Sequence, residues 1–205
     1  MRAFLFIALG DLLLCVLAVV ISAVNPRHAD AGMKPHVEYI IQASWSLEDG
    51  HDEDVDLWVL PPPGSVPVFY RNREAGLVLL DQDCLGKSNS TVLLADGSVV
   101  AAKECRETIS IRGIVPGKYD LALNLYSARD ERGIDIRAGK ARAIVVHTEI
   151  IQVNPRIQTM WKGDITLDEV HETRNWASFT LTAENRFEMV PVPLDPITNK
   201  FLTSN

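Results

Sequence analysis

Hydrophobic residues follow one pattern in the first 25 positions and a different one in the rest of the chain. Residues 4–24 are apolar throughout except for one carboxylate, Asp11. Because a helix needs about 20 apolar residues to cross a bilayer, this run predicts one transmembrane helix. After residue 36, short alternating or β-branched segments are separated by turn residues, and no long amphipathic pattern appears. These patterns predict a mainly β protein, with a single N-terminal transmembrane helix followed by an antiparallel β-sandwich domain.

The expected strands are short, and turn residues end several of them. The Asp96-Gly97 pair marks the turn of a hairpin. The strands are expected at residues 37–45, 54–60, 66–70, 76–80, 91–101 (the hairpin), 107–113, 118–127, 142–153 and 176–184. The chain therefore divides into a transmembrane helix (1–25), a linker (26–36), a β-sandwich domain (37–189) and an irregular C-terminal tail (190–205).

The lone carboxylate in the apolar run needs a reason, because an Asp near the centre of a span costs roughly 2.5–3.5 kcal/mol. On a helix, small residues share the face of Asp11, and bulky aliphatic residues occupy the opposite face. Small residues mark the packing face of a membrane helix, so we expect Asp11 to face protein or a water path. The expected helix-packing residues are Ala8, Cys15, Ala18 and Ser22.

Two other interpretations of the segment stay open. The acid could be incidental in a passive anchor, or the segment could be a signal peptide that is cut after Ala31. The apolar run is longer than the roughly 7–15 residues typical of a signal peptide, which favours an anchor. Arg2 precedes the span and the tail before it is short, so we expect a cytoplasmic N-terminus and an external domain.

Charge and cysteine content narrow the class of partner and the compartment. The formal net charge is -7, and no basic patch interleaved with aromatic residues appears, which argues against a nucleic-acid partner. Outside the expected span the only cysteines are Cys84 and Cys105. In an oxidising compartment they permit one disulfide, which we expect, and two unpaired thiols are the alternative.

The densest polar cluster surrounds the start of the second expected strand. Calcium takes several oxygen ligands, and a loop this acidic can supply them. The candidate ligands are Asp52, Asp54 and Asp56, together with Asp81 and Asp83 at the end of another strand. The spacing does not match an EF-hand, and a solvated acidic loop is the alternative. Asp54 and Asp56 share one face of a strand, so a structural role in capping neighbouring amides is also open.

No catalytic motif is present. The sequence contains no Gly-x-Ser-x-Gly, no His-Glu-x-x-His and no glycine-rich phosphate loop. The five histidines are dispersed, and none has the neighbours of a zinc site. We therefore expect a protein that is not an enzyme.

The opening stretch FLFIALGDLLLCVLAVVI resembles the single transmembrane helix of the MotB/TolR/ExbD family, the small subunits of proton-driven inner-membrane motors. Phe6, Asp11 and the leucines at 12–14 carry the resemblance. It implies that Asp11 carries the proton and that the domain after the span is periplasmic. It also implies a homodimer whose two helices lie inside the ring of a MotA/TolQ/ExbB-like polytopic partner.

A second resemblance covers residues 37–127. The segments DVDLWVLPPPG, REAGLVLLDQDCLG and RETISIRGIVPGKYDLALNLYS resemble a family of extracytoplasmic β-sandwich modules. Gly76 is followed directly by Leu77, which departs by one place from the middle segment of that family. The resemblance implies a fold and a location, but no ligand.

Two functions follow from these observations. In the first, the chain is the small subunit of a proton-driven motor or channel, and its sandwich transmits motion or engages an envelope target. In the second, it is a membrane-anchored periplasmic module that binds a metal, a glycan or a protein and has no proton role.

Overall fold

The computed structural model describes residues 36–48, 52–63, 66–88, 90–130, 132–195 and 197. Within these residues, no helix has the length and apolar character needed to span a membrane. The expected transmembrane helix, with Asp11 and its packing residues, lies outside the described residues, as does the linker up to residue 35.

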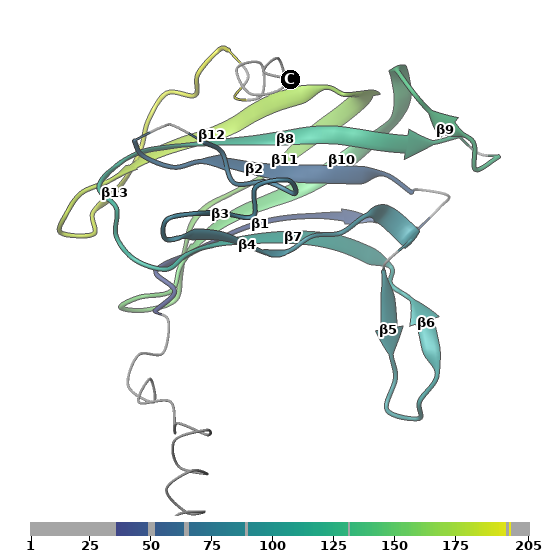
Figure 1. Ribbon diagram of the computed structural model, residues 1–205, viewed down its shortest axis with the longest axis horizontal. Helices are drawn as coiled ribbons and strands as arrows, with labels where there is room; N and C mark the ends of the chain where they lie inside the picture. The colour runs from purple at the N-terminus through teal and green to yellow at the C-terminus, as the bar shows by residue number, and fades with distance from the viewer. Residues whose placement is uncertain are drawn as a thin grey trace, which may run out of the picture. The chain divides into compact units, whose positions relative to one another are not determined.

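Two antiparallel sheets make up most of the described domain (Figure 1). The strand order is β11-β10-β1-β7-β4-β3 in the first sheet and β13-β12-β8-β2 in the second, where β9 pairs with the end of β8. The mainly β prediction is therefore confirmed. The first sheet contains β1 (Tyr39–Ser46), β3 (Glu74–Ala75), β4 (Val78–Gln82), β7 (Glu104–Ile111), β10 (Gly139–Gln152) and β11 (Gln158–Val170). The second contains β2 (Asp54–Leu60), β8 (Gly117–Arg129), β9 (Asp135–Ile136), β12 (Thr173–Leu181) and β13 (Phe187–Met189).

One hydrophobic core joins the two sheets. Every second residue of β1 is fully buried, as the two-residue period of a strand requires, whereas in β8 the residues from Leu121 to Leu125 are buried on both faces. Because buried residues of both sheets belong to the same cluster, the sheets pack face to face as a sandwich. The core-facing residues of β1 and β8 are Tyr39, Ile41, Ala43 and Trp45, and Tyr119, Leu121, Leu123 and Leu125.

Two segments differ from the expected strands. Residues 66–70 form only isolated bridges, at Val68 and Phe69. The bridge between Val59 and Val68 does not extend along β2, because the N–H of Leu57 donates to Glu107 and Pro61 has no N–H to donate. The long strand β11 was not expected. Most of its side chains are exposed or half-buried, so its sequence carries little of the alternation that predicts a strand.

The described part of the C-terminal tail is irregular but packs on the second sheet. The side-chain amide of Asn175, in β12, donates to the carbonyl of Pro193 at 2.9 Å and accepts the N–H of Ile197. Ile197 is buried against Trp58 and Phe69. This segment therefore covers part of the outer face of the second sheet.

A separate hairpin projects from the sandwich (Figure 1). It consists of β5 (Thr91–Leu93) and β6 (Val99–Ala101), where the sequence predicts a hairpin, and the short 3-10 helix η1 (Gly86–Ser88) precedes it. Gly97 adopts a φ of +83° in the turn, a conformation that glycine reaches without strain.

Candidate metal centre

Strand β2 lies at the edge of its sheet, and a carboxylate takes the place of a second strand partner. It pairs with β8 on one side, and on the other side Val59 exchanges two backbone hydrogen bonds with Val68 (3.1 and 2.7 Å). Further along this edge, the N–H of Leu57 donates to Oε2 of Glu107 at 2.5 Å. Glu107 belongs to β7 of the other sheet and faces the core, as Ile109 does two positions later. Its side chain therefore satisfies an amide that the sheet edge would otherwise leave unpaired.

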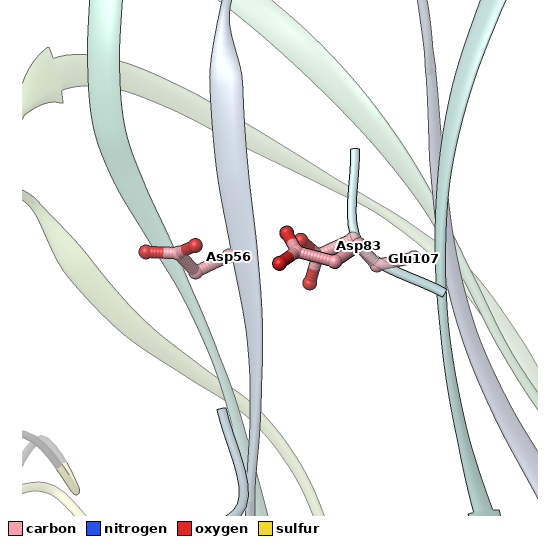
Figure 2. Close-up of side chains that lie close together, drawn as sticks. All are labelled: Asp56, Asp83 and Glu107. Carbon is pink, nitrogen blue, oxygen red and sulfur yellow. The ribbon is translucent and has the colours of Figure 1, made fainter. Parts of the chain in front are cut away.

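Three carboxylates from different segments meet at this edge. Asp56 comes from β2, Asp83 directly follows β4, and Glu107 comes from β7. One oxygen of each lies within 4.8 Å of the others (Figure 2). Asp56 and Glu107 are only 2% and 1% exposed, whereas Asp83 is half-buried.

Each of the two almost fully buried carboxylates has one oxygen atom without a hydrogen-bond donor. In the part of the chain that the structure describes, no group donates to Oδ2 of Asp56 or to Oε1 of Glu107. Asp83 forms an ion pair with Arg73 through Oδ2, at 3.1 Å. A buried polar group without a partner costs roughly 1–3 kcal/mol, and more when it is charged. The cluster therefore needs a proton or a cation.

Burial and mutual repulsion raise the pKa of the buried carboxyls. Burial is the main reason that the pKa of Asp56 lies well above its ordinary value; the charges of Asp54 and Asp83 add to the shift, and Arg71 opposes it. Burial, followed by the charge of Asp56, also raises the pKa of Glu107. Burial and neighbouring carboxylates raise the pKa of Asp54 to about 7. Without a cation these groups hold protons at a pH where exposed carboxyls have ionised.

Of the five predicted ligands, the structure brings Asp56 and Asp83 together. Asp54 lies near enough for its charge to raise the pKa of Asp56. The other two carboxylates are engaged elsewhere. Asp52 accepts the backbone N–H of Lys87 and pairs with Arg129, each at 2.7 Å.

Asp81 lies away from the cluster as well. It pairs with Arg112 at 2.5 Å, and both side chains are one-third exposed. The sequence analysis missed Glu107, although a signal for it exists. Ile109 and Ile111 show which alternate positions of β7 face the core, and Glu107 is a charged residue at one of these positions.

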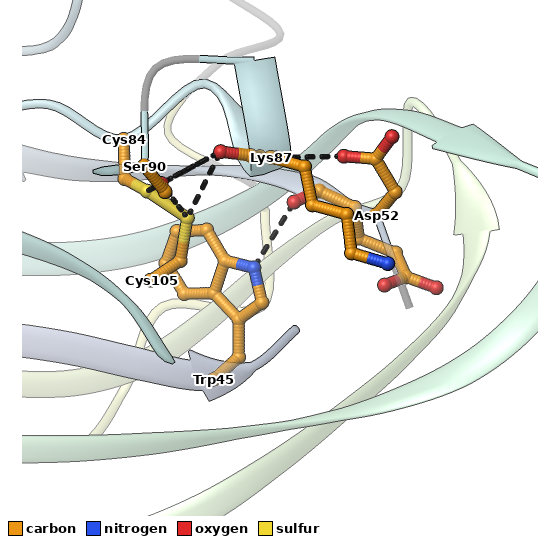
Figure 3. The surroundings of a disulfide bond; sticks show 8 residues. Trp45, Asp52, Cys84, Lys87, Ser90 and Cys105 are labelled. Atoms are coloured by element: carbon orange, nitrogen blue, oxygen red, sulfur yellow. Dashed lines mark hydrogen bonds between the residues drawn. A yellow bond between two sulfur atoms is a disulfide. The ribbon is translucent and has the colours of Figure 1, made fainter. Parts of the chain in front are cut away.

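A disulfide joins two segments that carry carboxylates of the cluster, and Figure 3 shows its surroundings. Cys84 and Cys105 are joined with their Cα atoms 5.8 Å apart. Cys84 directly follows Asp83, and Cys105 precedes Glu107 by two positions, so the bond links the segments that carry two of the three carboxylates. The buried hydroxyl of Ser90 lies 2.8 Å from Sγ of Cys84.

Asp83 also lines an open cavity of about 360 Å³, together with Ser90, Glu104 and Arg106. Of the three carboxylate residues, Asp83 is the one that lines this cavity.

Comparison of the chain with protein-family models, with curated proteins and with solved structures found no match. The carboxylate cluster and the surfaces of the domain are therefore the basis for assigning a function.

Proposed function

We propose that the β-sandwich is a binding module in which Asp56, Asp83 and Glu107 hold one divalent cation, with calcium as the expected ion. The observation that carries this proposal is the pair of buried carboxylate oxygens, on Asp56 and Glu107, that no described group donates to. Calcium binds oxygen ligands at roughly 2.3–2.6 Å, so two ligands of one ion are at most about 5 Å apart. The three oxygens, all within 4.8 Å of one another, meet that limit.

Charge balance supports the same assignment. Three ionised carboxylates carry three negative charges, of which a divalent ion would offset two. Arg73, paired with Asp83, offsets the third. The repulsion that adds to the effect of burial on these pKa values would then be replaced by attraction to the ion.

Calorimetric titration of the full chain in mild detergent with calcium chloride tests this function. We expect one ion per chain, and we expect Asp56→Asn to abolish binding because it removes a ligand charge. Asp81→Asn is the matched control, since its carboxylate pairs with Arg112 at the surface and should leave binding unchanged. A parent chain that shows no binding heat, and no change in Tm between calcium and chelator, would overturn the proposal.

We also propose that the chain acts within a proton-driven complex of the bacterial inner membrane. The observation that favours this role is the single carboxylate, Asp11, on the small-residue face of the apolar segment. Asp11 would carry the proton, and two copies would lie inside a MotA/TolQ/ExbB-like polytopic partner. The periplasmic sandwich would then transmit motion or engage an envelope target.

Proton flux into vesicles that carry the complex tests the role of Asp11. Asp11→Asn keeps the size of the side chain but removes its titration, so flux should vanish while the complex still assembles. Asp11→Glu keeps a titrating group and should retain partial flux. Full flux in Asp11→Asn would leave the chain as a binding module on a passive anchor.

A further inference from the structure

The outer face of the first sheet carries a row of polar side chains that crosses five strands. These side chains alternate along their strands with core residues such as Ile41 and Ile109, so they point away from the core. Neighbouring strands lie about 4.8 Å apart, so the row is on the order of 20 Å long. In the strand register its members lie opposite one another, from β11 to β4: Lys162, Glu149, Gln42, Thr108 and Gln82.

A second polar row lies two positions further along the strands. His147 of β10 lies opposite Ser44 of β1, and Ser44 lies opposite Arg106 of β7. His147 pairs with Asp164 at 2.8 Å, and Arg106 pairs with Glu104 at 3.0 Å. The hydrogen bond from Arg106 is the main reason that the pKa of Glu104 lies below its ordinary value, so this carboxylate is ionised at neutral pH.

Two open cavities follow these rows and meet at Glu104 and Arg106, which line both of them. One cavity, of about 400 Å³, extends from Arg106 to Lys162. The other, of about 360 Å³, extends from Arg106 past Gln82 to Val92 in strand β5 of the projecting hairpin. Each cavity has the size of a small-molecule site. Because they share two residues, together they form one polar cross-strand groove.

Three side chains of the cross-strand groove have unused hydrogen-bonding groups. Within the described part of the chain, no group bonds to the side-chain amides of Gln42 and Gln82 or to the ammonium group of Lys162. An amide both donates and accepts hydrogen bonds, and an ammonium group donates them. A ligand can therefore bond to these three side chains without breaking a bond inside the protein.

The charges of the cross-strand groove disfavour an anionic ligand. Three carboxylates line it, those of Asp83, Glu104 and Glu149, against the two cations Arg106 and Lys162. A chain with a negative charge on every unit would be repelled by the carboxylates along its whole length. The groove is better matched to a neutral ligand that is rich in hydrogen-bonding groups.

The shape and composition of the groove favour a sugar chain over a peptide. Bound peptides commonly add a strand to a sheet edge or place apolar side chains in pockets. This groove crosses the face of a sheet, and its apolar side chains are Val92 and Ala102, beside Cys84 of the disulfide. Sugar hydroxyls both donate and accept, so they can bond to amides, carboxylates and a guanidinium group alike.

We propose that the cross-strand groove binds a neutral polysaccharide chain, which lies across the strands from Lys162 to Val92. Arg106 contacts the middle of the bound segment, and Gln42 and Gln82 bond to its hydroxyls on either side. Among the described residues that line the two cavities, none is Trp, Tyr or Phe, so binding depends on hydrogen bonds. We therefore expect a dissociation constant on the order of 1 mM. The proposal rests neither on the cation nor on the proton role of Asp11.

Saturation-transfer NMR of the full chain with cellohexaose and with chitohexaose, two neutral chains, tests the proposal. The detergent should have no sugar headgroup, and chelator should be present so that the carboxylate cluster holds no cation. We expect saturable binding of a neutral hexasaccharide and weaker binding of the matching disaccharide, which is too short to reach both cavities. Hexagalacturonate, with a carboxylate on every ring, should bind more weakly than the neutral chain.

Substitutions at opposite ends of the groove identify the site. Lys162→Ala and Gln82→Ala should each weaken binding of the hexasaccharide about 2–10-fold, the effect of one lost hydrogen bond. The double variant should show about the product of the two effects, since the sites are far apart. Lys118→Ala, on the second sheet, and Gln158→Ala, at an exposed position that lines neither cavity, are the matched controls and should leave binding unchanged.

Thermal unfolding checks that the variants fold, which we expect because neither Lys162 nor Gln82 has a side-chain partner among the described residues. No saturable binding of either neutral hexasaccharide, or binding that Lys162→Ala and Gln82→Ala leave unchanged, would overturn the proposal. Tighter binding of hexagalacturonate than of the neutral chains would overturn it as well. Binding of hexaglycine without binding of the sugars would replace the polysaccharide with a peptide.

Discussion

Replacing Glu107 by Gln separates two roles of this side chain, edge cap and ion ligand. Gln keeps an oxygen that can accept the N–H of Leu57, and it removes a charge that faces Asp56 and Asp83. In chelator we expect the variant to be at least as stable as the parent chain, because burial and neighbouring carboxylates disfavour that charge. In calcium we expect it to lose the stabilisation that the ion supplies.

The size of the effect follows from linkage. An ion that binds only the folded state at 100 times its Kd raises the free energy of unfolding by about 2.7 kcal/mol. For a domain of this size, 1 kcal/mol corresponds to about 2–4 °C in Tm. Calcium should therefore raise the Tm of the parent chain by about 5–10 °C and that of Glu107→Gln by much less.

Glu107→Ala provides the contrast. It removes both the charge and the acceptor, so the N–H of Leu57, a fully buried residue, loses its partner. That loss costs about 1–3 kcal/mol, to which the cavity left by the side chain adds. In chelator, Glu107→Ala should melt below both the parent chain and Glu107→Gln.

Thermal unfolding of the full chain in mild detergent, followed by circular dichroism with and without calcium, measures all of these differences. Asp81→Asn serves as the control, since it removes a carboxylate that is outside the cluster. A Glu107→Gln variant that gains as much Tm from calcium as the parent chain would remove Glu107 from the ion site. A Glu107→Gln variant that melts as low as Glu107→Ala would refute its role as a neutral edge cap.

Two further predictions concern the disulfide and pH. Changing both Cys84 and Cys105 to Ser should lower the free energy of unfolding by about 3 kcal/mol, for a sequence separation of 21. The change should also weaken calcium binding, because Asp83 and Glu107 are no longer held together. Thermal unfolding and calcium titration measure the two effects, and an unchanged calcium affinity would exclude a role of the disulfide in positioning these residues. In chelator, the raised pKa of Asp54 means that the folded state holds a proton which the unfolded state releases, so stability should fall as the pH rises from the ordinary value of 3.8 to about 7. Denaturant unfolding across this range should show that fall, and stability that rises instead would contradict the burial of these carboxyls.

Local sequence pattern was sufficient to predict most of the domain. The alternation in β1 and β8 places their apolar residues on one face whatever the neighbouring strands are, because successive side chains of a strand point in opposite directions. The Asp96-Gly97 turn is local as well, since it needs only a residue that tolerates positive φ. Strand β11 was missed because it is an edge strand with exposed faces, and such a strand needs little of the hydrophobic alternation on which the prediction depends.

The carboxylate cluster was decided by tertiary structure. Asp56 and Asp83 lie in acidic stretches that the sequence identifies as candidate ligands, and so do Asp52 and Asp81. Only the packing shows that Asp52 forms an ion pair with Arg129 and that Asp81 forms one with Arg112. Glu107 joins the cluster because β7 of one sheet lies beside the free edge of β2 in the other. Strand alternation places a side chain on a face of its own strand, whereas the meeting of segments distant in sequence depends on how the two sheets pack.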